Sequence, residues 1–154
     1  MALKYFDWAK HQASMRPNKV AIKDYYSGEQ LTYLELEKRA LKIAAYFQKK
    51  NIGKKDRVAL LSKNNSIFFE LQFACAKTGV ILVPLNWRLT ASELSFILND
   101  CDPKLLIFDS PFKGIVSLLN NSSKNMQRLE FDSSNINNEF SSVWKLLDED
   151  VDNI

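Results

Sequence analysis

The most informative stretch of the chain is AKTGVILVPLNWRLT, residues 76–90. Gly79 is expected to end a helix, because glycine readily takes the left-handed conformation found at helix ends. The short apolar run at residues 81–83 is typical of a strand buried on both faces of a parallel sheet. Thr90, with Glu93 three residues later, forms a capping box that predicts the start of the next helix. This one stretch therefore predicts a helix end, a strand and a new helix in succession.

The same alternation continues on both sides of this stretch. Thr32 and Glu35 form another capping box, followed by apolar residues at helical spacing. The remaining predicted elements are a helix at 5–15, a hairpin from 20–22 and 30–31, a helix from Thr32 that stops at Asn51 or Gly53, a strand at 58–61, a helix from Asn65 or Ser66, and a strand at 105–108. We therefore expect an α/β fold in which a parallel sheet is flanked by helices in three layers, with a small N-terminal hairpin.

The pattern weakens after Asp109. Ser110 and Pro111 are expected to start a short helix through Leu119, and one short strand is expected at residues 129–131. The predicted organisation is an α/β subdomain at 1–109, a weaker α/β continuation at 110–147 with Asn- and Ser-rich loops and a last helical turn at 140–147, and an acidic linker at 148–154.

Composition and charge exclude several classes of protein. The 154 residues carry a formal net charge of +3, from 21 basic and 18 acidic side chains mixed along the chain. Nucleic-acid-binding proteins usually gather their basic residues in a stripe or tail, so no nucleic-acid partner is expected. Cys75 and Cys101 have neither metal nor redox spacing and indicate buried free thiols in a reducing compartment. Without a signal-peptide pattern or a membrane-length apolar run, a cytoplasmic location is expected, and peripheral membrane contact stays open.

No catalytic constellation is visible in the sequence. The four glycines, at positions 28, 53, 79 and 114, are too far apart to form a phosphate-binding loop. His11 has no cysteine or acid placed for a triad and is expected at the surface or at a helix cap. A Gly-x-Ser-x-Gly nucleophile elbow is absent. Neither a catalytic residue nor a metal ligand is therefore predicted in this chain.

Several segments together resemble the adenylate-forming enzymes, a family that includes acyl-CoA synthetases, luciferases and peptide-synthetase adenylation domains. The segments are LTYLEL at 31–36, NIG at 51–53, DRVAL at 56–60, NS at 65–66 and the stretch at 76–90. They occur in the order and spacing of the family, and the resemblance extends over about residues 5–109. NWRLT at 86–90, followed by Glu93 and Leu94, looks most like the acyl-CoA synthetase branch, with a fatty acid as the substrate.

The resemblance implies that the chain is an N-terminal part of the large domain of an AMP-forming acyl-CoA synthetase. Such an enzyme joins a carboxylic acid to ATP, releases pyrophosphate, and passes the acyl group from the adenylate to coenzyme A, while Mg²⁺ neutralises phosphate charge. In the family, ATP binding begins at a Ser/Thr/Gly-rich loop that ends in lysine, and no such loop occurs before Ile154. The acidic linker is expected to lead toward this missing ATP-binding region. The chain alone is therefore expected to be inactive and to bind none of these cofactors tightly.

Arg88 is the one residue that the resemblance suggests for ligand binding. It matches a position that lies near the nucleotide phosphates of coenzyme A in some relatives, and a guanidinium can bind phosphate through two parallel hydrogen bonds. The alternative is that Arg88 pairs with an acid such as Glu93, or faces solvent. Lys55 departs from the family pattern, which often has glycine there, and is expected to affect only a turn.

Two other interpretations stay open. The acceptor of the acyl group could be a carrier protein instead of coenzyme A, or the chain could be a non-catalytic binding module that keeps the fold. A truncated enzyme is expected to expose apolar surface where the remainder of the same chain packs. Such surface would bind hydrophobic dyes or cause self-association.

Overall fold

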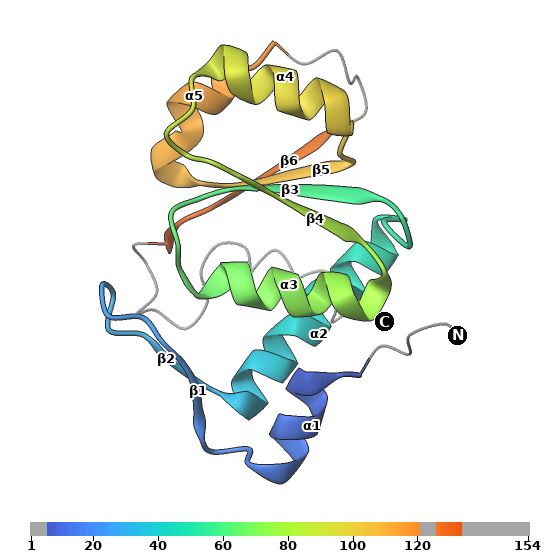
Figure 1. The fold of residues 1–154 in the computed structure, drawn as a ribbon, viewed down its shortest axis with the longest axis vertical. Coiled ribbons are helices and arrows are strands. Elements are labelled where there is room, and N and C mark those ends of the chain that lie inside the picture. Colours follow the sequence, from blue (N-terminus) through green and yellow to red (C-terminus); the bar gives the residue numbers. More distant parts are fainter. Residues whose placement is uncertain (1–5, 121–125, 134–154) are drawn as a thin grey trace.

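The computed structural model describes residues 6–120 and 126–133. Its elements are α1 (Trp8–Met15), β1 (Val20–Lys23), β2 (Gln30–Thr32), α2 (Tyr33–Lys49), β3 (Arg57–Leu61), α3 (Ser66–Thr78), β4 (Ile81–Leu85), α4 (Ala91–Cys101), β5 (Leu105–Asp109), the 3-10 turn η1 (Ser110–Phe112), α5 (Lys113–Ser117) and β6 (Gln127–Phe131). β1 and β2 pair antiparallel as a hairpin, whereas β4, β3, β5 and β6 form, in that order, a parallel sheet. Helices cover both faces of this sheet (Figure 1). The predicted α/β fold with three layers and a small hairpin is confirmed.

The two central strands, β3 and β5, contribute side chains to two separate cores. Successive side chains of a strand point to opposite faces of its sheet. The core beneath α2 and α3 contains Val58, Leu60, Leu105 and Ile107. The core beneath α4 and α5 contains Ala59, Leu61, Leu106 and Phe108. Because both faces are covered, the apolar runs at 58–61 and 105–108 are continuous instead of alternating, which is the pattern that predicted buried strands.

β4 differs from β3 and β5 because it lies at an edge of the sheet that the described residues form. Ile81 and Pro84 are exposed, and Leu82 and Val83 are only half-buried. The prediction that residues 81–83 form a strand is confirmed, but the prediction that both faces are buried is wrong. The position also explains Pro84, since an edge strand can contain a residue without an N–H.

Both predicted capping boxes are present. The Glu35 N–H donates to Thr32 Oγ1 at 3.3 Å, and the Thr32 N–H donates to Glu35 Oε2 at 2.7 Å, at the start of α2. At the start of α4, the Glu93 N–H donates to Thr90 Oγ1 at 3.4 Å and the Thr90 N–H donates to Glu93 Oε2 at 2.8 Å. Each box satisfies backbone donors that a helix start leaves free.

Residues in the left-handed backbone conformation follow the ends of two helices and occur in one turn, at predicted places. Gly79, with φ of 75°, follows the end of α3. Asn51, with φ of 54°, follows α2, so of the two predicted stops it is Asn51 and not Gly53 that takes this conformation. Lys55 has φ of 74°, a conformation that glycine adopts without steric strain. Lys55 lies in the turn before β3, as expected.

Beyond Asp109 the chain continues the same sheet. η1 and α5 form the predicted short helical segment, which ends at Ser117 instead of Leu119, and β6 begins at Gln127 and pairs with β5. The predicted helical turn at 140–147 and the linker at 148–154 lie outside the described residues. These two predictions, and the division of the chain at residue 109, stay predictions.

Backbone hydrogen bonds join the four strands at their amino ends. The Ile81 N–H donates to the Asp56 carbonyl at 2.7 Å, the Lys104 N–H to the Arg57 carbonyl at 2.9 Å, and the Gln127 N–H to the Lys104 carbonyl at 2.9 Å. These bonds extend the pairing of the strands, which continues along their whole length, to the residues just before them.

Candidate functional site

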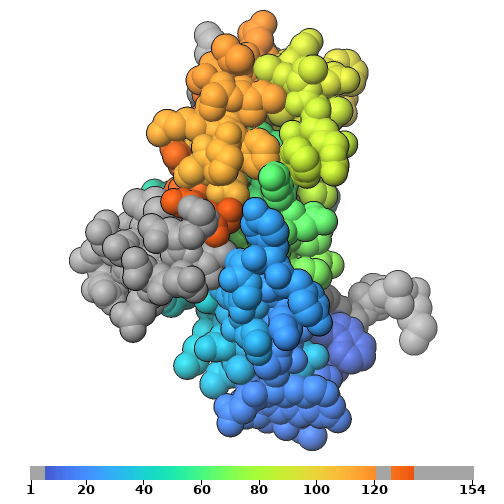
Figure 2. All heavy atoms as spheres, turned by 90° about the vertical axis from the view of Figure 1, so that its left-hand side faces the viewer, coloured from blue at the N-terminus to red at the C-terminus, as the bar shows by residue number. Residues whose placement is uncertain are grey.

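The loops beyond the carboxyl ends of the strands are the candidate region for ligand binding. In open parallel α/β sheets, ligands bind in the crevice outside these ends. β3 ends at Leu61 and β4 at Leu85, and these two residues are paired in register. Figure 2 views the molecule from this side, where the green segment after β3 lies next to the yellow-green segment after β4. We call this region the carboxyl edge.

Two cations lie over one indole ring at the carboxyl edge. The guanidinium carbon of Arg88 is 4.2 Å from the centre of the Trp87 ring, and Lys63 Nζ is 5.2 Å from the same centre. Lys63 and Trp87 each stand two residues after the paired strand ends Leu61 and Leu85, which brings them side by side. In the described part of the chain, neither cation forms an ion pair with a carboxylate.

Arg88, the predicted contact for coenzyme A, is exposed. Its backbone N–H donates to Asn86 Oδ1 at 3.1 Å, which fixes the turn after β4. Glu93 does not pair with Arg88, because its carboxylate accepts hydrogen bonds from the Thr90 N–H and hydroxyl, both at 2.8 Å. These bonds lower the pKa of Glu93. The structure therefore excludes the Glu93 pair, while a role of Arg88 in ligand binding stays a prediction.

The position of Trp87 is set by its neighbours. Its ring lies 6.3 Å from that of Phe112, centre to centre, and both rings pack against the core beneath α4 and α5. Sequence reasoning selected neither Trp87 nor Lys63. Their equal distance from the ends of two apolar runs was visible in the sequence, but the adjacency of β3 and β4 was not.

The amino end of α3 adds partial positive charge to the same edge. Asn65, which precedes this helix, does not cap it with its side chain. Instead Asn65 Nδ2 donates to Ser62 Oγ at 3.0 Å, and Ser62 Oγ donates to the Lys63 carbonyl at 2.8 Å. The loop after β3 is therefore held by its own polar groups. The start of a helix carries roughly half a positive charge, so this edge favours an anion.

The polar groups after β5 and β6 are already used within the fold. Asp109 is buried, and its carboxylate accepts hydrogen bonds from the Ser133 N–H, at 3.0 Å, and from the Ser133 hydroxyl. Ser110 Oγ donates to the Phe131 carbonyl at 2.9 Å. These contacts join the ends of the two strands, so a structural role accounts for them.

A buried carboxylate lies between α2 and α3. Arg39 Nη1 donates to Glu70 Oε1 at 3.0 Å and to Glu29 Oε1 at 2.9 Å, which ties the hairpin to both helices. Burial raises the pKa of Glu70 to about 7, although Arg39 acts in the opposite direction. A shifted pKa can mark a functional group, but here the carboxylate is enclosed among helices and its contacts hold them together.

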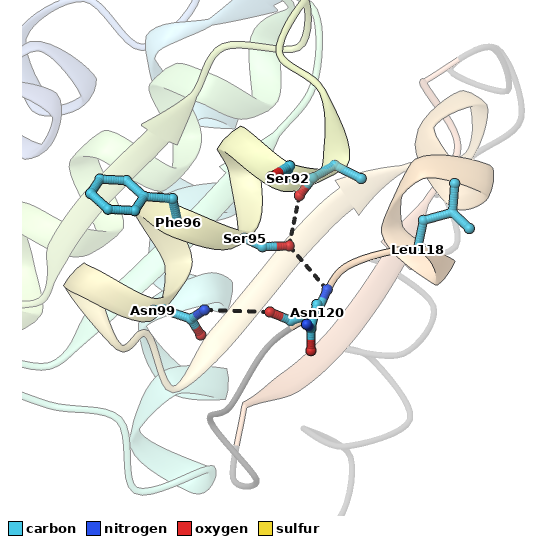
Figure 3. A pocket seen from close by; sticks show the side chains of 7 residues that line it. Ser92, Ser95, Phe96, Asn99, Leu118 and Asn120 are labelled. Carbon is cyan, nitrogen blue, oxygen red and sulfur yellow. Dashed lines mark hydrogen bonds between the residues drawn. The ribbon is translucent and has the colours of Figure 1, made fainter.

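An open depression of about 400 Å³ lies between α4 and residues 118–120 (Figure 3). Ser95 Oγ donates to the Ala91 carbonyl at 2.6 Å and accepts a hydrogen bond from the Asn120 N–H at 3.0 Å. Asn99 Nδ2 donates to the Asn120 carbonyl at 3.3 Å. None of the described lining residues carries a charge or a thiol, so the depression offers no acid–base chemistry.

Other reactive groups in the described residues do not gather into a site. Among residues 6–120 and 126–133, no three His, Cys, Asp or Glu side chains are placed to hold a metal ion, and no helix is long and apolar enough to cross a membrane. Cys75 and Cys101 are free thiols, as predicted, but Cys101 is only half-buried. Burial raises the pKa of Cys75 to about 12, which leaves it unreactive. His11 is exposed on α1, as predicted.

The chain belongs to the AMP-binding enzyme family, whose model matches residues 9–151. It is similar to the fatty acid–[acyl-carrier-protein] ligase ScoC of Streptomyces coeruleorubidus, with 42% identity over 89 residues, or 58% of this chain and 17% of ScoC. It is also similar to the long-chain-fatty-acid–CoA ligase FadD13 of Mycobacterium tuberculosis, with 33% identity over 118 residues, or 76% of this chain and 24% of FadD13. The family predicted from the sequence motifs is confirmed.

A solved structure supports the same assignment. The N-terminal domain of FACL13 from Mycobacterium tuberculosis superposes with a TM-score of 0.76 at 28% identity, over 83% of this chain and 34% of that domain. The chain thus spans only a part of its relatives, between 17% and 24% of the two curated ligases.

Proposed function

We propose that this chain is part of an acid–thiol ligase that activates a fatty acid with ATP and transfers the acyl group to coenzyme A. Its similarity to ligases named for long-chain fatty acids and for a fatty acid with an acyl carrier protein supports this substrate class. Because the chain spans a quarter or less of these ligases, both half-reactions are assigned to the whole protein. The chain by itself is proposed to be inactive. Its two free cysteines support a location in the reducing cytoplasm.

The observation that carries the assignment of a binding role is the placement of Arg88. Its guanidinium is exposed at the carboxyl edge, beside the amino end of α3 and without a carboxylate partner among the described residues. A phosphate of coenzyme A would supply the missing negative charge and can accept two hydrogen bonds from the guanidinium fork. When bound, coenzyme A supplies the thiol that accepts the acyl group.

ATP and Mg²⁺ find no equivalent site in the described residues, which hold neither a glycine-rich phosphate loop nor a cluster of carboxylates for a metal ion. We therefore assign the binding of ATP and Mg²⁺ to other parts of the whole protein. The residues described here would bind neither tightly.

The two half-reactions of the intact protein test this function separately. Exchange of pyrophosphate into ATP, in the presence of a fatty acid, measures adenylate formation, and thioester formation measures transfer to coenzyme A. The variant Arg88→Ala is expected to raise the KM for coenzyme A about tenfold or more, the loss expected for one charge-assisted hydrogen bond. Pyrophosphate exchange should stay at the wild-type rate.

Each result has a defined meaning. If Arg88→Ala slows both half-reactions equally, the role of Arg88 in binding coenzyme A is wrong. If the intact wild-type protein exchanges no pyrophosphate with any carboxylic acid, the ligase proposal is wrong and a binding module that keeps the fold replaces it.

The similarity to ScoC favours a second candidate acceptor, an acyl carrier protein. A carrier protein presents its thiol on a phosphopantetheine arm and lacks the nucleotide of coenzyme A. Thioester formation with a phosphopantetheinylated carrier protein but not with coenzyme A would establish this alternative. The acceptor assay therefore includes both thiols at matched concentrations.

The remainder of the same protein is the proposed partner of the exposed apolar side chains. Phe69 on α3 is 44% exposed, and Phe96 on α4 is 76% exposed, so both outer helix layers carry large apolar groups in contact with solvent. Apolar surface that is exposed in a part of a protein can mark where another part packs, and we assign these side chains to such contacts. We expect the same exposed side chains to cause self-association of the isolated chain.

A further inference from the structure

Lys63 and Arg88 form an unusual charge arrangement at the carboxyl edge. Both cations lie over the ring of Trp87, at 5.2 Å and 4.2 Å from its centre. The negative face of an aromatic ring attracts a cation, and this attraction offsets part of the repulsion between the two like charges. No carboxylate among the described residues neutralises either of them. One ring therefore contacts two positive charges that have no counter-charge among residues 6–120 and 126–133.

The scaffold fixes this arrangement from three sides. The pairing of Leu61 with Leu85 brings the loop of Lys63 beside the loop of Trp87. Trp87 packs against Phe112 and the core, and Ser62 Oγ donates to the Lys63 carbonyl, so both loops are held by contacts within the fold. Fixed backbone positions and a fixed ring lower the cost of ordering the two cations around an anion.

We propose that Lys63 is a second phosphate contact for the nucleotide end of coenzyme A, and that Trp87 is the positioning residue that sets the spacing between Lys63 and Arg88. The inference rests on the proposed function, in which Arg88 binds a phosphate of the same ligand. Two adjacent cations suit a ligand with several phosphate groups better than they suit a single carboxylate, since each can balance a different negative charge. Lys63 then contributes to affinity for the nucleotide end and not to the chemistry at the thiol.

The test compares coenzyme A with pantetheine, which has the same thiol end but no nucleotide or phosphate. In the intact protein, Lys63→Gln is expected to raise the KM for coenzyme A about tenfold or more, the loss expected when one charged hydrogen-bond partner is removed. The KM for pantetheine and the rate of pyrophosphate exchange should not change. Trp87→Leu should raise the KM for coenzyme A as well, whereas Trp87→Phe, which keeps an aromatic face, should retain most of the affinity.

The matched control is Lys54→Gln, which removes the same charge from an exposed side chain in the turn before β3, at the opposite edge of the sheet. This variant should leave the KM for coenzyme A within about twofold of wild type, since a distant surface charge is largely screened by salt. An equal effect of Lys54→Gln and Lys63→Gln would mean that only net charge matters, and would overturn the proposal.

Failure of the inference can be told apart from failure of the proposed function. If Arg88→Ala weakens coenzyme A but Lys63→Gln does not, the function stands and the role of Lys63 is wrong. If Lys63→Gln weakens coenzyme A and pantetheine equally, Lys63 does not contact the nucleotide and the proposal is also wrong. If the intact wild-type protein forms no thioester with coenzyme A, the proposed function and the inference fail together.

Discussion

The helical layer formed by α1, α2 and α3 and the carboxyl edge of the sheet both contain lysine or arginine, but these cations have different surroundings. In the helical layer, Lys77 Nζ donates to Asp7 Oδ2 at 2.6 Å and to Glu37 Oε1 at 2.9 Å. Burial opposes the charge of Lys77, yet the two carboxylates raise its pKa overall. At the carboxyl edge, Lys63 and Arg88 are exposed and lie over an aromatic ring. The charge of Lys77 is satisfied inside the fold, whereas the charges of Lys63 and Arg88 are available to a ligand.

This difference separates stability from binding. Substitutions in the helical layer should change the free energy of unfolding, because they leave a buried partner unpaired. Substitutions of Lys63 and Arg88 at the carboxyl edge should change ligand affinity and leave the free energy of unfolding almost unchanged.

The largest expected effect is that of Lys77→Met. Removing one partner of a buried ion pair typically costs about 3 kcal/mol or more, because the remaining charge has lost its compensation. Glu37 and Lys77 are each only 9% exposed at their side chains, so a loss of this size in the free energy of unfolding is expected in urea titrations at pH 7. The double variant Lys77→Met with Glu37→Met should recover much of it. A matched variant, Lys104→Met, removes an exposed pair with Asp56 and should cost less than about 1 kcal/mol.

The next effect is a dependence of stability on pH that Glu70 creates. Its pKa rises from an ordinary 4.5 to about 7 through burial. Between these two values the folded protein binds more protons than the unfolded chain, so stability falls as the pH rises through this window. The total change is about 3 kcal/mol at most. In Glu70→Gln this decline should be absent between pH 5 and pH 8, as measured by the free energy of unfolding in urea at each pH.

Glu35→Gln is the control for this pH series. Hydrogen bonds from the Thr32 N–H and hydroxyl lower the pKa of Glu35. Its contribution to stability is therefore present above the ordinary pKa and is lost as the pH falls below it. The slope between pH 5 and pH 8 should match that of wild type. An identical decline in Glu70→Gln would show that another group titrates in this window.

The smallest expected effect is that of Lys63→Met and Arg88→Met on stability. Both side chains are exposed and lack a carboxylate partner in the described part of the chain, so the free energy of unfolding should change by no more than about 1 kcal/mol, the value of an exposed cation–aromatic contact. The same urea titrations measure it. A loss as large as that of Lys77→Met would remove the distinction between the two regions, because these cations would then also hold the fold together.

The sequence predicts those parts of the fold that depend on local signals. The capping boxes at Thr32 and Thr90, the left-handed stop at Gly79 and the apolar strands β3 and β5 all follow from residues a few positions apart. The edge position of β4 could not be predicted in this way. β3 and β4 have similar apolar sequences, and only the order of strands in the sheet, which depends on contacts between distant residues, leaves Ile81 exposed.

The candidate site was predictable to a smaller extent. Arg88 was selected because it stands in a motif that resembles a known family, and the structure places it at the carboxyl edge of the sheet. Lys63 was not selected, because its relation to Trp87 arises only when Leu61 pairs with Leu85. Glu70 was missed for a similar reason, since an acid within an apolar helix gives no sign of the arginine that pairs with it from another helix.

The hydrogen bonds that join the strands at their amino ends also bear on how such a protein can evolve. Because these bonds lie at the amino ends, a substitution in the loop after β4, which contains Trp87 and Arg88 at the opposite edge, leaves them intact. New ligands can then be accommodated through changes in this loop, whereas Asp109 and Ser110 at the same edge are held by their contacts within the fold. A lineage built on this sheet can therefore diversify what it recognises while the core sequences of β3 and β5 change little.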